Sequence, residues 1–373
     1  MRYYIIAGEA SGDLHASNLM RELKLKDANA AFRCWGGDLM EAQGAQIVKH
    51  YRDLAFMGFA EVVLNLRTIL NNISFCKKDI QEYRPDVLIL VDYPGFNLRI
   101  AGFAKRMGIK VVYYISPQIW AWKESRVNTI KKAVDKMLVI LPFEKEFYAK
   151  HGYHVDFVGH PLLDAVINYD KNKNNSSRAA IVSEQDKRPI IALLPGSRKQ
   201  EIKTMLPIML SAEDHFPEYR FIIAAAPSQD ISYYQQFLKG KSIQVVSGRT
   251  YDLLQVASAA LVTSGTATLE TALFNVPEVV CYKGNKLSYL IARSLVKIKF
   301  ISLVNLIMDR EIVRELIQDD LNTDCLVKEM KKILSPDGQL RMKEQFEQLR
   351  LKLGGSGASL KAAQLIIDYL SHS

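Results

Sequence analysis

Apolar residues along the chain form two alternating patterns, which are short continuous runs and longer segments with a helical period. Continuous runs rich in β-branched and aromatic side chains are typical of strands in a parallel sheet that is covered on both faces. These runs lie at 3–7, 86–91, 110–115, 137–141, 189–194, 220–226, 243–246, 259–263 and 279–282. Helical patterns such as 13–24 and 96–107 separate them. We therefore predict an α/β protein with doubly wound parallel sheets.

A polar segment divides the strand-like runs into two series. Residues 168–177 are rich in Asn, Lys and Ser, a composition typical of exposed connectors. We predict a Rossmann-like domain at 1–167, a linker at 168–178 and a second Rossmann-like domain at 179–353. The two domains are expected to face a cleft, where paired domains commonly hold ligands. Residues 354–373 begin with a glycine-rich break and are predicted to end in an amphipathic helix.

Composition narrows the class of protein. Of the 373 residues, 49% are apolar and 24% are charged, which is ordinary for a globular chain. No apolar run approaches the roughly 18 residues of a membrane-spanning helix, and the four cysteines are scattered as in reduced, cytosolic proteins. The net charge of +9 permits a phosphate-bearing ligand or an anionic membrane. We expect no nucleic-acid binding, because no motif of that kind occurs and the basic residues are dispersed.

The first strand-like run is followed by a loop with small residues and two carboxylates. Small residues let a ligand approach the backbone, and the helix that follows offers unpaired N–H groups. Glu9 and Asp13 would repel a pyrophosphate, so together with Ser11 they are better suited to sugar hydroxyls. An equally good interpretation is a plain strand–helix turn in which Asp13 is a cap.

Two further candidates follow later strands of the first half. Asp92 ends the run 86–91, where ligands of open α/β sheets bind, and its carboxylate can act as a general base. The alternative is an Asp that begins a turn before Pro94. Trp120 and Trp122 follow the run 110–115. We expect one ring to pack internally, and Trp122 remains a candidate for sugar or acyl contact.

The second half carries two helix starts suited to anions. Gly196 allows close approach, Ser197 can donate, and Arg198 offers a planar fork for pyrophosphate oxygens. Further on, small and hydroxylated residues open another helix, and Glu270 can accept hydrogen bonds from ribose hydroxyls or simply complement the helix dipole. The candidates of this second start are Ser264, Gly265 and Thr266.

Two stretches are candidates for contact with a membrane. An apolar stripe with helical spacing is usually core, but this one is wide and flanked by cations, as in interfacial helices. Its candidate contacts are Met57, Phe59, Val62, Val63 and Leu66. The stretch 283–299 holds five basic residues and no acidic one, which fits either a solvated face or contact with phosphate or anionic lipid.

Six motifs in one order resemble a known family. They are Gly8-Glu9-x-Ser11-Gly12-Asp13, Asp92-x-Pro94-x-Phe96-Asn97, Ser116-Pro117-x-Ile119-Trp120-Ala121-Trp122, Leu141-Pro142-Phe143-Glu144, Leu194-Pro195-Gly196-Ser197-Arg198 and Ser264-Gly265-Thr266-Ala267-x-Leu269-Glu270. Together they resemble lipid-A-disaccharide synthase, an inverting glycosyltransferase of the GT-B fold, over nearly the whole chain. Gly95 departs from the family pattern, since some members carry a second acid there, and so does Val304, where many have proline.

The resemblance implies a reaction and its participants. UDP-2,3-diacylglucosamine would donate its sugar to the 6-hydroxyl of 2,3-diacylglucosamine 1-phosphate, giving a β-1,6-linked disaccharide 1-phosphate and UDP. Asp92 would be the base, Arg198 the phosphate contact on the facing domain, and Asn305 a nucleotide contact. No cofactor or metal is expected, since the sequence has no D-x-D motif and no metal-ligand spacing.

The resemblance also implies where the protein acts. It would attach peripherally to the inner, cytoplasmic face of the membrane, because both substrates carry acyl chains. The final helix would pack on the first domain or exchange with a second copy in a homodimer. Two other functions remain open at this point: a soluble GT-B enzyme similar to UDP-N-acetylglucosamine 2-epimerase, and a nucleotide-sugar sensor that is not an enzyme.

Overall fold

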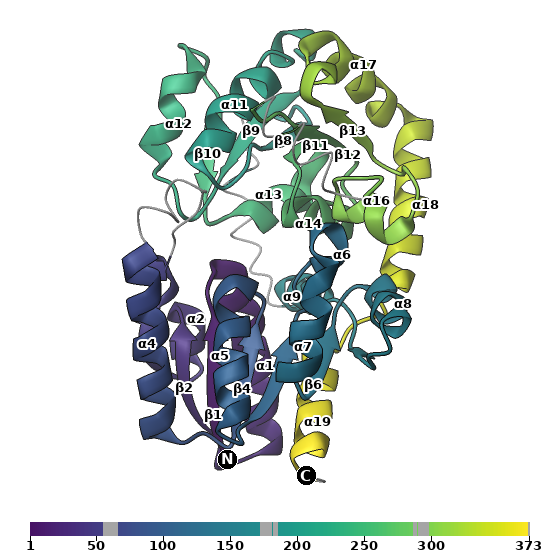
Figure 1. The fold of residues 1–373 in the computed structure, drawn as a ribbon. Helices are drawn as coiled ribbons and strands as arrows, with labels where there is room; N and C mark the ends of the chain where they lie inside the picture. Colours follow the sequence, from purple (N-terminus) through teal and green to yellow (C-terminus); the bar gives the residue numbers. More distant parts are fainter. Residues whose placement is uncertain (55–65, 172–180, 182–185, 286–288, 290–297, 372–373) are drawn as a thin grey trace. The chain divides into compact units, whose positions relative to one another are not determined.

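The chain forms two compact units. The computed structural model describes all residues except 55–65, 172–180, 182–185, 286–288, 290–297 and 372–373. Unit 1 comprises Met1–Asp164 and Leu353–Ser373, and unit 2 comprises Ala165–Lys352. The chain therefore enters unit 2 once and returns once to unit 1 (Figure 1).

Unit 1 is built on a parallel sheet of seven strands in the order β3-β2-β1-β4-β5-β6-β7. The central strands are continuous apolar runs, and every residue of β4 is buried, as expected for a sheet covered on both faces. The strands are β1 (Arg2–Ala7), β2 (Ala31–Gly36), β3 (Gln46–His50), β4 (Val87–Val91), β5 (Lys110–Tyr114), β6 (Lys136–Val139) and β7 (Asp156–Phe157).

Helices lie on both faces of this sheet. On one face, Tyr4 and Ile6 of β1 join a core with Ile80 of α4 and Ile100 of α5. On the other face α1 packs against α19, and Lys26 donates a hydrogen bond of 2.6 Å to Gln364. The helices are α1 (Ala10–Lys26), α2 (Asp38–Ala42), α4 (Leu66–Tyr83), α5 (Pro94–Arg106), α6 (Ile119–Trp122), α7 (Val127–Ala133), α8 (Pro142–Lys150) and α19 (Ala358–Ser371), with the short 3₁₀ turns η1 (Tyr51–Leu54) and η2 (Glu124–Arg126). The helix α9 (Pro161–Lys171) begins in unit 1 and continues into unit 2.

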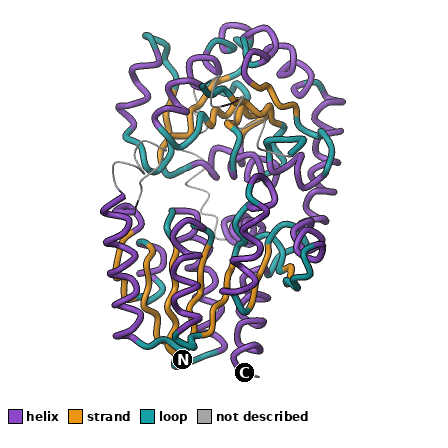
Figure 2. The backbone as a smooth tube through the Cα atoms, in the orientation of Figure 1, coloured by secondary structure: helices purple, strands orange, loops and turns teal. Residues whose placement is uncertain are grey.

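Unit 2 repeats the same plan with a parallel sheet of six strands in the order β10-β9-β8-β11-β12-β13. Counted within each unit, both sheets begin with the Rossmann order 3-2-1-4-5-6. Figure 2 shows each set of strands flanked by its own helices. The strands are β8 (Ile190–Leu194), β9 (Arg220–Ala225), β10 (Gln244–Ser247), β11 (Ala257–Thr263), β12 (Glu278–Tyr282) and β13 (Arg314–Ile317). The predicted class, two doubly wound α/β units, is confirmed.

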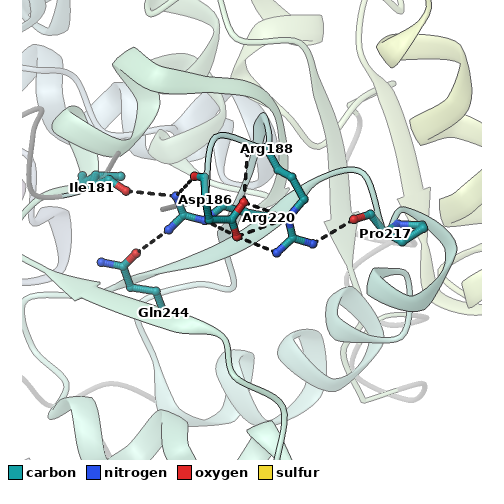
Figure 3. A network of polar contacts seen from close by, with 6 residues as sticks. All are labelled: Ile181, Asp186, Arg188, Pro217, Arg220 and Gln244. Carbon is teal, nitrogen blue, oxygen red and sulfur yellow. Dashed lines mark hydrogen bonds and ion pairs between the residues drawn. The ribbon is translucent and has the colours of Figure 1, made fainter. Parts of the chain in front are cut away.

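A network of arginines ties together the strand starts of unit 2. Arg188 makes a bidentate contact with Asp186, and Arg220, at the start of β9, reaches the same carboxylate at 3.5 Å (Figure 3). The hydrogen bonds from Arg188 hold the pKa of Asp186 down at about 2. The helices of the unit are α11 (Lys199–Leu210), α12 (Ile231–Leu238), α13 (Thr250–Val256), α14 (Thr266–Leu273), α16 (Leu303–Met308), α17 (Thr323–Leu334) and α18 (Pro336–Lys352), with the 3₁₀ turns η3 (Glu213–His215) and η4 (Gln318–Asp320).

The predicted linker needs a correction at its beginning. Residues 168–171 are the last residues of α9 (Pro161–Lys171) and not a connector. Tyr169 explains the continuation, because its ring packs edge-on against Tyr251 and its hydroxyl donates to Asp252. The remaining predicted linker residues, 172–178, lie outside the described part of the chain.

Candidate active site

The strand order of unit 1 reverses between β1 and β4, which pair in parallel with Ala7 opposite Val91. Ligands of open α/β sheets bind at such a switch point, beyond the carboxyl ends of the strands. The loops that begin at Gly8 and Asp92 therefore emerge side by side. The loop after β5 is next to them, because Val91 also pairs with Tyr114.

Backbone strain is concentrated at this edge of the sheet. Asp92 and Tyr93 have φ angles of 46° and 50°, and Ile115 has 67°, which is unusual for a β-branched residue. The carbonyl oxygen of Asp92 accepts hydrogen bonds from the Asn97 side chain (2.7 Å) and from the Tyr113 hydroxyl (2.6 Å). These two contacts hold the strained turn, and such strain clusters at functional sites.

The strained turn places the Asp92 carboxyl in an environment that favours its neutral form. Burial raises its pKa to about 7, the negative charge of Glu9 adds to this effect, and a hydrogen bond from the Tyr93 backbone opposes it. A carboxyl with a pKa near 7 is half ionised at neutral pH. It can therefore both accept and return a proton under working conditions, which is the requirement for a general base.

The β1 loop packs closely against this turn. A Cβ atom placed on Gly8 would lie 2.5 Å from ring atoms of Tyr93, so only glycine fits here. Glu9 is the N-cap of α1 but makes no capping hydrogen bond with its side chain. Ser11, in the first turn of α1, is exposed. Glu9 and Ser11 thus lie at the start of α1, directly after the strand that pairs with β4.

Asp13 does not fit its predicted sugar-binding role. Its side chain is only 3% exposed, and its two oxygens accept backbone N–H groups of Gly37 (2.8 Å), Leu39 (3.1 Å) and Met40 (3.1 Å). Asp13 therefore binds the amino end of α2 rather than capping its own helix. The carboxylate is a structural anchor between α1 and the loop that follows β2.

The two tryptophans after β5 have different environments. Trp120 packs edge-on against Phe143 and donates to the Glu144 carboxylate at 3.3 Å. Burial raises the pKa of Glu144 to about 7, against the opposing effect of hydrogen bonds from the backbone of Leu141 and Ile140. Trp122 is 54% exposed, which leaves its ring available for a ligand. Sequence analysis gave no role to Glu144, Asn97 or Tyr113. Asn97 and Glu144 do stand in two of the six motifs, which is the signal that could have drawn attention to them.

In unit 2 the strand order reverses between β8 and β11, and Leu194 pairs with Val262. The predicted pyrophosphate residues follow β8 directly. Gly196 has a φ of +105°, and the backbone N–H groups of Ser197 and Arg198 both donate to Glu201, at 3.0 and 3.3 Å. The Glu201 carboxylate thus holds the N–H groups that sequence analysis expected to meet an anion. The Arg198 side chain is 61% exposed and lies 3.7 Å from the same carboxylate.

The second helix start lies on the neighbouring strand of the same sheet. A Cβ atom on Gly265 would meet no described atom within 4 Å, and Thr266 is exposed. The Ser264 hydroxyl donates to the backbone of Ile301 at 2.9 Å. Glu270 accepts a hydrogen bond of 2.7 Å from Tyr251, and burial raises its pKa. The open backbone around Gly265 is therefore the accessible part of this predicted nucleotide site.

Asn305 does not fit its predicted contact with a nucleotide. Its side chain is fully buried and donates to Val313 (2.8 Å) and Glu315 (2.9 Å). Its oxygen accepts from the backbone of Ile312 (2.8 Å) and Val313 (3.1 Å). An amide has two donors and two acceptor sites, so all are used within the fold. Asn305 joins α16 to the start of β13.

The predicted membrane contacts fall mainly outside the described residues. This is the case for Met57, Phe59, Val62 and Val63, and the side chain of Leu66 at the start of α4 is likewise not described. Further along α4, Ile73 is buried, whereas Leu70 and Phe75 are 56% and 48% exposed. Within the described residues, no helix combines the length and the apolar character needed to cross a bilayer. Most of the basic stretch 283–299 is also outside the described chain.

No group of three or more His, Cys, Asp or Glu side chains in the described ranges is placed to hold a metal ion. His160 is 3% exposed, and its Nδ1 accepts the N–H of Leu162 at 3.3 Å. Burial lowers the pKa of His160 to about 3, with a contribution from the nearby His15. Both imidazoles are therefore neutral parts of the core of unit 1.

Comparison with known proteins identifies the family. Residues 3–368 match the family described as lipid-A-disaccharide synthetase. A lipid-A-disaccharide synthase of Syntrophus aciditrophicus is 40% identical, covering 99% of this chain and 98% of its own. One from Geobacter metallireducens is 37% identical, covering 99% and 97%.

Solved structures share the fold at much lower identity. UDP-GlcNAc 2-epimerase of Neisseria meningitidis, bound to UDP-GlcNAc, superimposes with a TM-score of 0.68 at 12% identity over the whole of both chains. The glycotransferase of kitacinnamycin gives 0.66 at 14%, over 99% of each. These likenesses concern the fold alone, so the sequence relatives decide between the enzyme families left open by the motifs. This chain belongs to the lipid-A-disaccharide synthase family.

Proposed function

We propose that the chain transfers the sugar of UDP-2,3-diacylglucosamine to the 6-hydroxyl of 2,3-diacylglucosamine 1-phosphate, with Asp92 as the base. The membership of the family makes it a glycosyltransferase of lipid A biosynthesis. The observation that carries the residue assignment is the Asp92 carboxyl at the switch point of unit 1, with its pKa raised to about 7.

The proposed chemistry is a single displacement. The acceptor 6-hydroxyl attacks the anomeric carbon of the donor, the bond from that carbon to the diphosphate breaks, and the hydroxyl proton passes to Asp92. Inversion at the anomeric carbon follows from attack opposite the leaving group. Glu9, at the N-cap of α1, and Ser11, in the first turn of that helix, are proposed to hold hydroxyl groups of the acceptor sugar.

The leaving UDP is assigned to the switch point of unit 2. Arg198, exposed beside the start of α11, is proposed to bind the pyrophosphate, together with the backbone at Gly196 and Ser197. For the anion to reach those N–H groups, the Glu201 carboxylate has to give up its hydrogen bonds to them. Ser264, Gly265, Thr266 and Glu270 are proposed to hold the nucleoside, whereas Asn305 is no longer a candidate.

Attachment to the inner face of the cytoplasmic membrane is part of this proposal. The substrates carry acyl chains, and α4 exposes Leu70 and Phe75. A homodimer also remains a proposal. Within one chain, α19 packs on α1, and the Asp164 carboxylate accepts the N–H groups of Gly357 and Ser359, so the last helix is anchored without a second copy.

The test is incubation of the purified chain with both acylated substrates and analysis by mass spectrometry. The expected result is the tetraacyl disaccharide 1-phosphate together with one equivalent of UDP. UDP release without an acceptor product would indicate hydrolysis, and binding of UDP-sugar without turnover would indicate the sensor function. Cosedimentation with vesicles that contain anionic lipid tests the membrane attachment separately.

A further inference from the structure

A cationic and aromatic cluster lies directly after the β5 loop of unit 1. The exposed ring of Trp122 has two positive charges over it: the Arg126 guanidinium carbon is 5.2 Å and the Lys123 nitrogen 5.5 Å from the ring centroid. Arg126 ends the 3₁₀ turn η2, and Val127 begins α7. The indole and the two cations thus form one surface on unit 1, which the mechanism above does not use.

Arg126 differs from comparably buried arginines. Arg33 lies 2.5 Å from Asp79, Arg220 is 3.5 Å from Asp186, and Arg249 is 2.9 Å from Asp252. The Arg126 guanidinium, although half-buried, forms no ion pair or hydrogen bond with any residue that the structure describes, and its contact is the Trp122 ring. A partly desolvated guanidinium without a carboxylate is a ready partner for an external anion.

The position of Arg126 connects this cluster to the proposed base. Burial raises the pKa of Tyr113 well above its ordinary value and the charge of Asp92 adds to this, whereas the positive charge of Arg126 opposes it. Arg126 therefore lies within electrostatic reach of the Tyr113 hydroxyl, which donates to the Asp92 carbonyl at 2.6 Å. The cluster also follows β5, which pairs with β4, the strand that ends directly before Asp92.

We propose that Arg126 binds the phosphate group of the acceptor, with the Trp122 ring against the adjoining sugar and with Lys123 as a second charge. The inference rests on the proposed reaction, in which the acceptor is a sugar phosphate. The diphosphate of the donor is assigned to unit 2 in that proposal, so the cluster on unit 1 is assigned to the phosphate of the acceptor. A guanidinium can meet two phosphate oxygens at once, and an indole face packs against a sugar ring. The cluster then distinguishes the acceptor from an unphosphorylated glycolipid.

Membrane phospholipid offers the same chemistry, because its headgroup also presents a phosphate beside an apolar phase. The experiment separates these two sources. The acceptor is prepared with and without its 1-phosphate, and kcat/KM is measured for both in a neutral detergent that contains no phospholipid. The same measurement is repeated with vesicles that contain anionic lipid. The variants are Arg126→Ala and, as a charge-matched control on α7, Lys132→Ala.

The expected result is specific for the acceptor. Arg126→Ala should lower kcat/KM for the phosphorylated acceptor by roughly 10- to 100-fold, as lost charge-assisted hydrogen bonds do, and leave the value for the unphosphorylated acceptor unchanged. Lys132→Ala should change neither. Arg126→Lys should recover part of the loss, because it retains the charge but not the planar fork.

Three outcomes would overturn the inference. Equal losses with both acceptors would mean that Arg126 only supports the fold of the β5 loop. A loss seen with anionic vesicles but absent in neutral detergent would assign the cluster to the membrane surface. Wild-type protein that transfers sugar to both acceptors equally well would show that the phosphate is not recognised, while leaving the proposed reaction intact. Wild-type protein that is inactive with both acceptors would refute the proposed reaction itself.

Discussion

The charge of Glu9 acts on the carboxyl of Asp92. The two residues come from loops after adjacent strands, β1 and β4, and burial together with the charge of Glu9 raises the pKa of Asp92 to about 7. Among the described residues, no positively charged side chain contributes to the shift of this pKa. The carboxylate of Glu9 thus disfavours ionisation of Asp92, and substitutions at either residue should change the pH dependence of the reaction.

The first prediction concerns the base itself. Asp92→Asn should lower kcat by roughly 10²- to 10⁴-fold, the usual contribution of a positioned base. In the wild type, kcat/KM should fall as the pH drops below about 7, because only the ionised carboxyl accepts the proton. That acidic limb should be absent from the residual activity of the variant. A folded variant with near-native kcat would exclude Asp92 as the base.

The second prediction tests the influence of Glu9. Glu9→Gln removes a negative charge that disfavours ionisation of Asp92, so the acidic limb of the kcat/KM profile should move to lower pH. The profile is measured over pH 5–9 beside that of wild type. Glu22→Gln, which removes a carboxylate from the body of α1, is the matched control and should leave the limb in place. An unchanged limb in the Glu9 variant would show that burial alone sets the pKa.

The third prediction concerns the close packing of the two loops. Gly8→Ala places a Cβ atom 2.5 Å from the Tyr93 ring, which has to move, and Tyr93 is part of the strained turn at Asp92. Activity should fall sharply and the unfolding free energy should drop by about 1–3 kcal/mol, as for overpacking. Gly102→Ala in α5 is the control, since its Cβ would have its nearest neighbour at 3.7 Å. Denaturant unfolding and kcat measure the two effects.

The fourth prediction concerns the leaving group. Arg198→Ala should cost on the order of 3 kcal/mol of transition-state stabilisation, as the loss of a preorganised donor to a developing negative charge does. The loss should appear in kcat. Lys203→Ala, an exposed cation of the same helix, should have no comparable effect. A rise in KM with an unchanged kcat would reassign Arg198 to ground-state binding.

The fifth prediction concerns a buried acid away from the site. Glu278 is fully buried at the start of β12, neither of its carboxyl oxygens has a partner among the described residues, and burial raises its pKa well above the usual value. The folded protein therefore retains a proton that the unfolded chain releases above pH of about 4.5. Stability is greatest below that pH and is lost as the pH rises toward the pKa of the folded state.

Glu278→Met, which has a similar volume, should therefore stabilise the fold by about 1–3 kcal/mol, with a larger gain at pH 8 than at pH 5. Urea unfolding at the two pH values measures this gain. Glu278→Gln keeps a polar group but removes the titration, so its stability relative to wild type should vary with pH in the same direction. Equal effects at both pH values would contradict a protonated Glu278.

Two kinds of feature can be predicted from the sequence: strands that consist of a continuous apolar run, and candidate site residues that directly follow such strands. All nine predicted strands exist, because buried parallel strands require such runs. The strands that sequence analysis did not predict, β2, β3, β7 and β13, are short or interrupted by polar residues such as Arg33, whose guanidinium is bound by Asp79. Their place in the sheets follows from tertiary pairing.

Side-chain roles are less predictable than strand positions. Asp13 and Asn305 have the chemistry of ligand contacts, yet both are occupied by backbone groups distant in sequence. Glu201 is occupied locally, because its carboxylate accepts the N–H groups of Ser197 and Arg198 at the place where an anion was expected. Conversely, the hydrogen bond from Tyr113 to the Asp92 carbonyl depends on the pairing of β4 with β5, and no sequence spacing indicates it.

The return of the chain to unit 1 has a consequence for biosynthesis. Because α19 covers α1 and is tied through Asp164, a ribosome has to finish unit 2 before the first unit can be completed. Until then, the side of α1 that α19 covers is available to chaperones or proteases. A stop codon that removes α19 would therefore damage unit 1, although most of that unit is translated before unit 2.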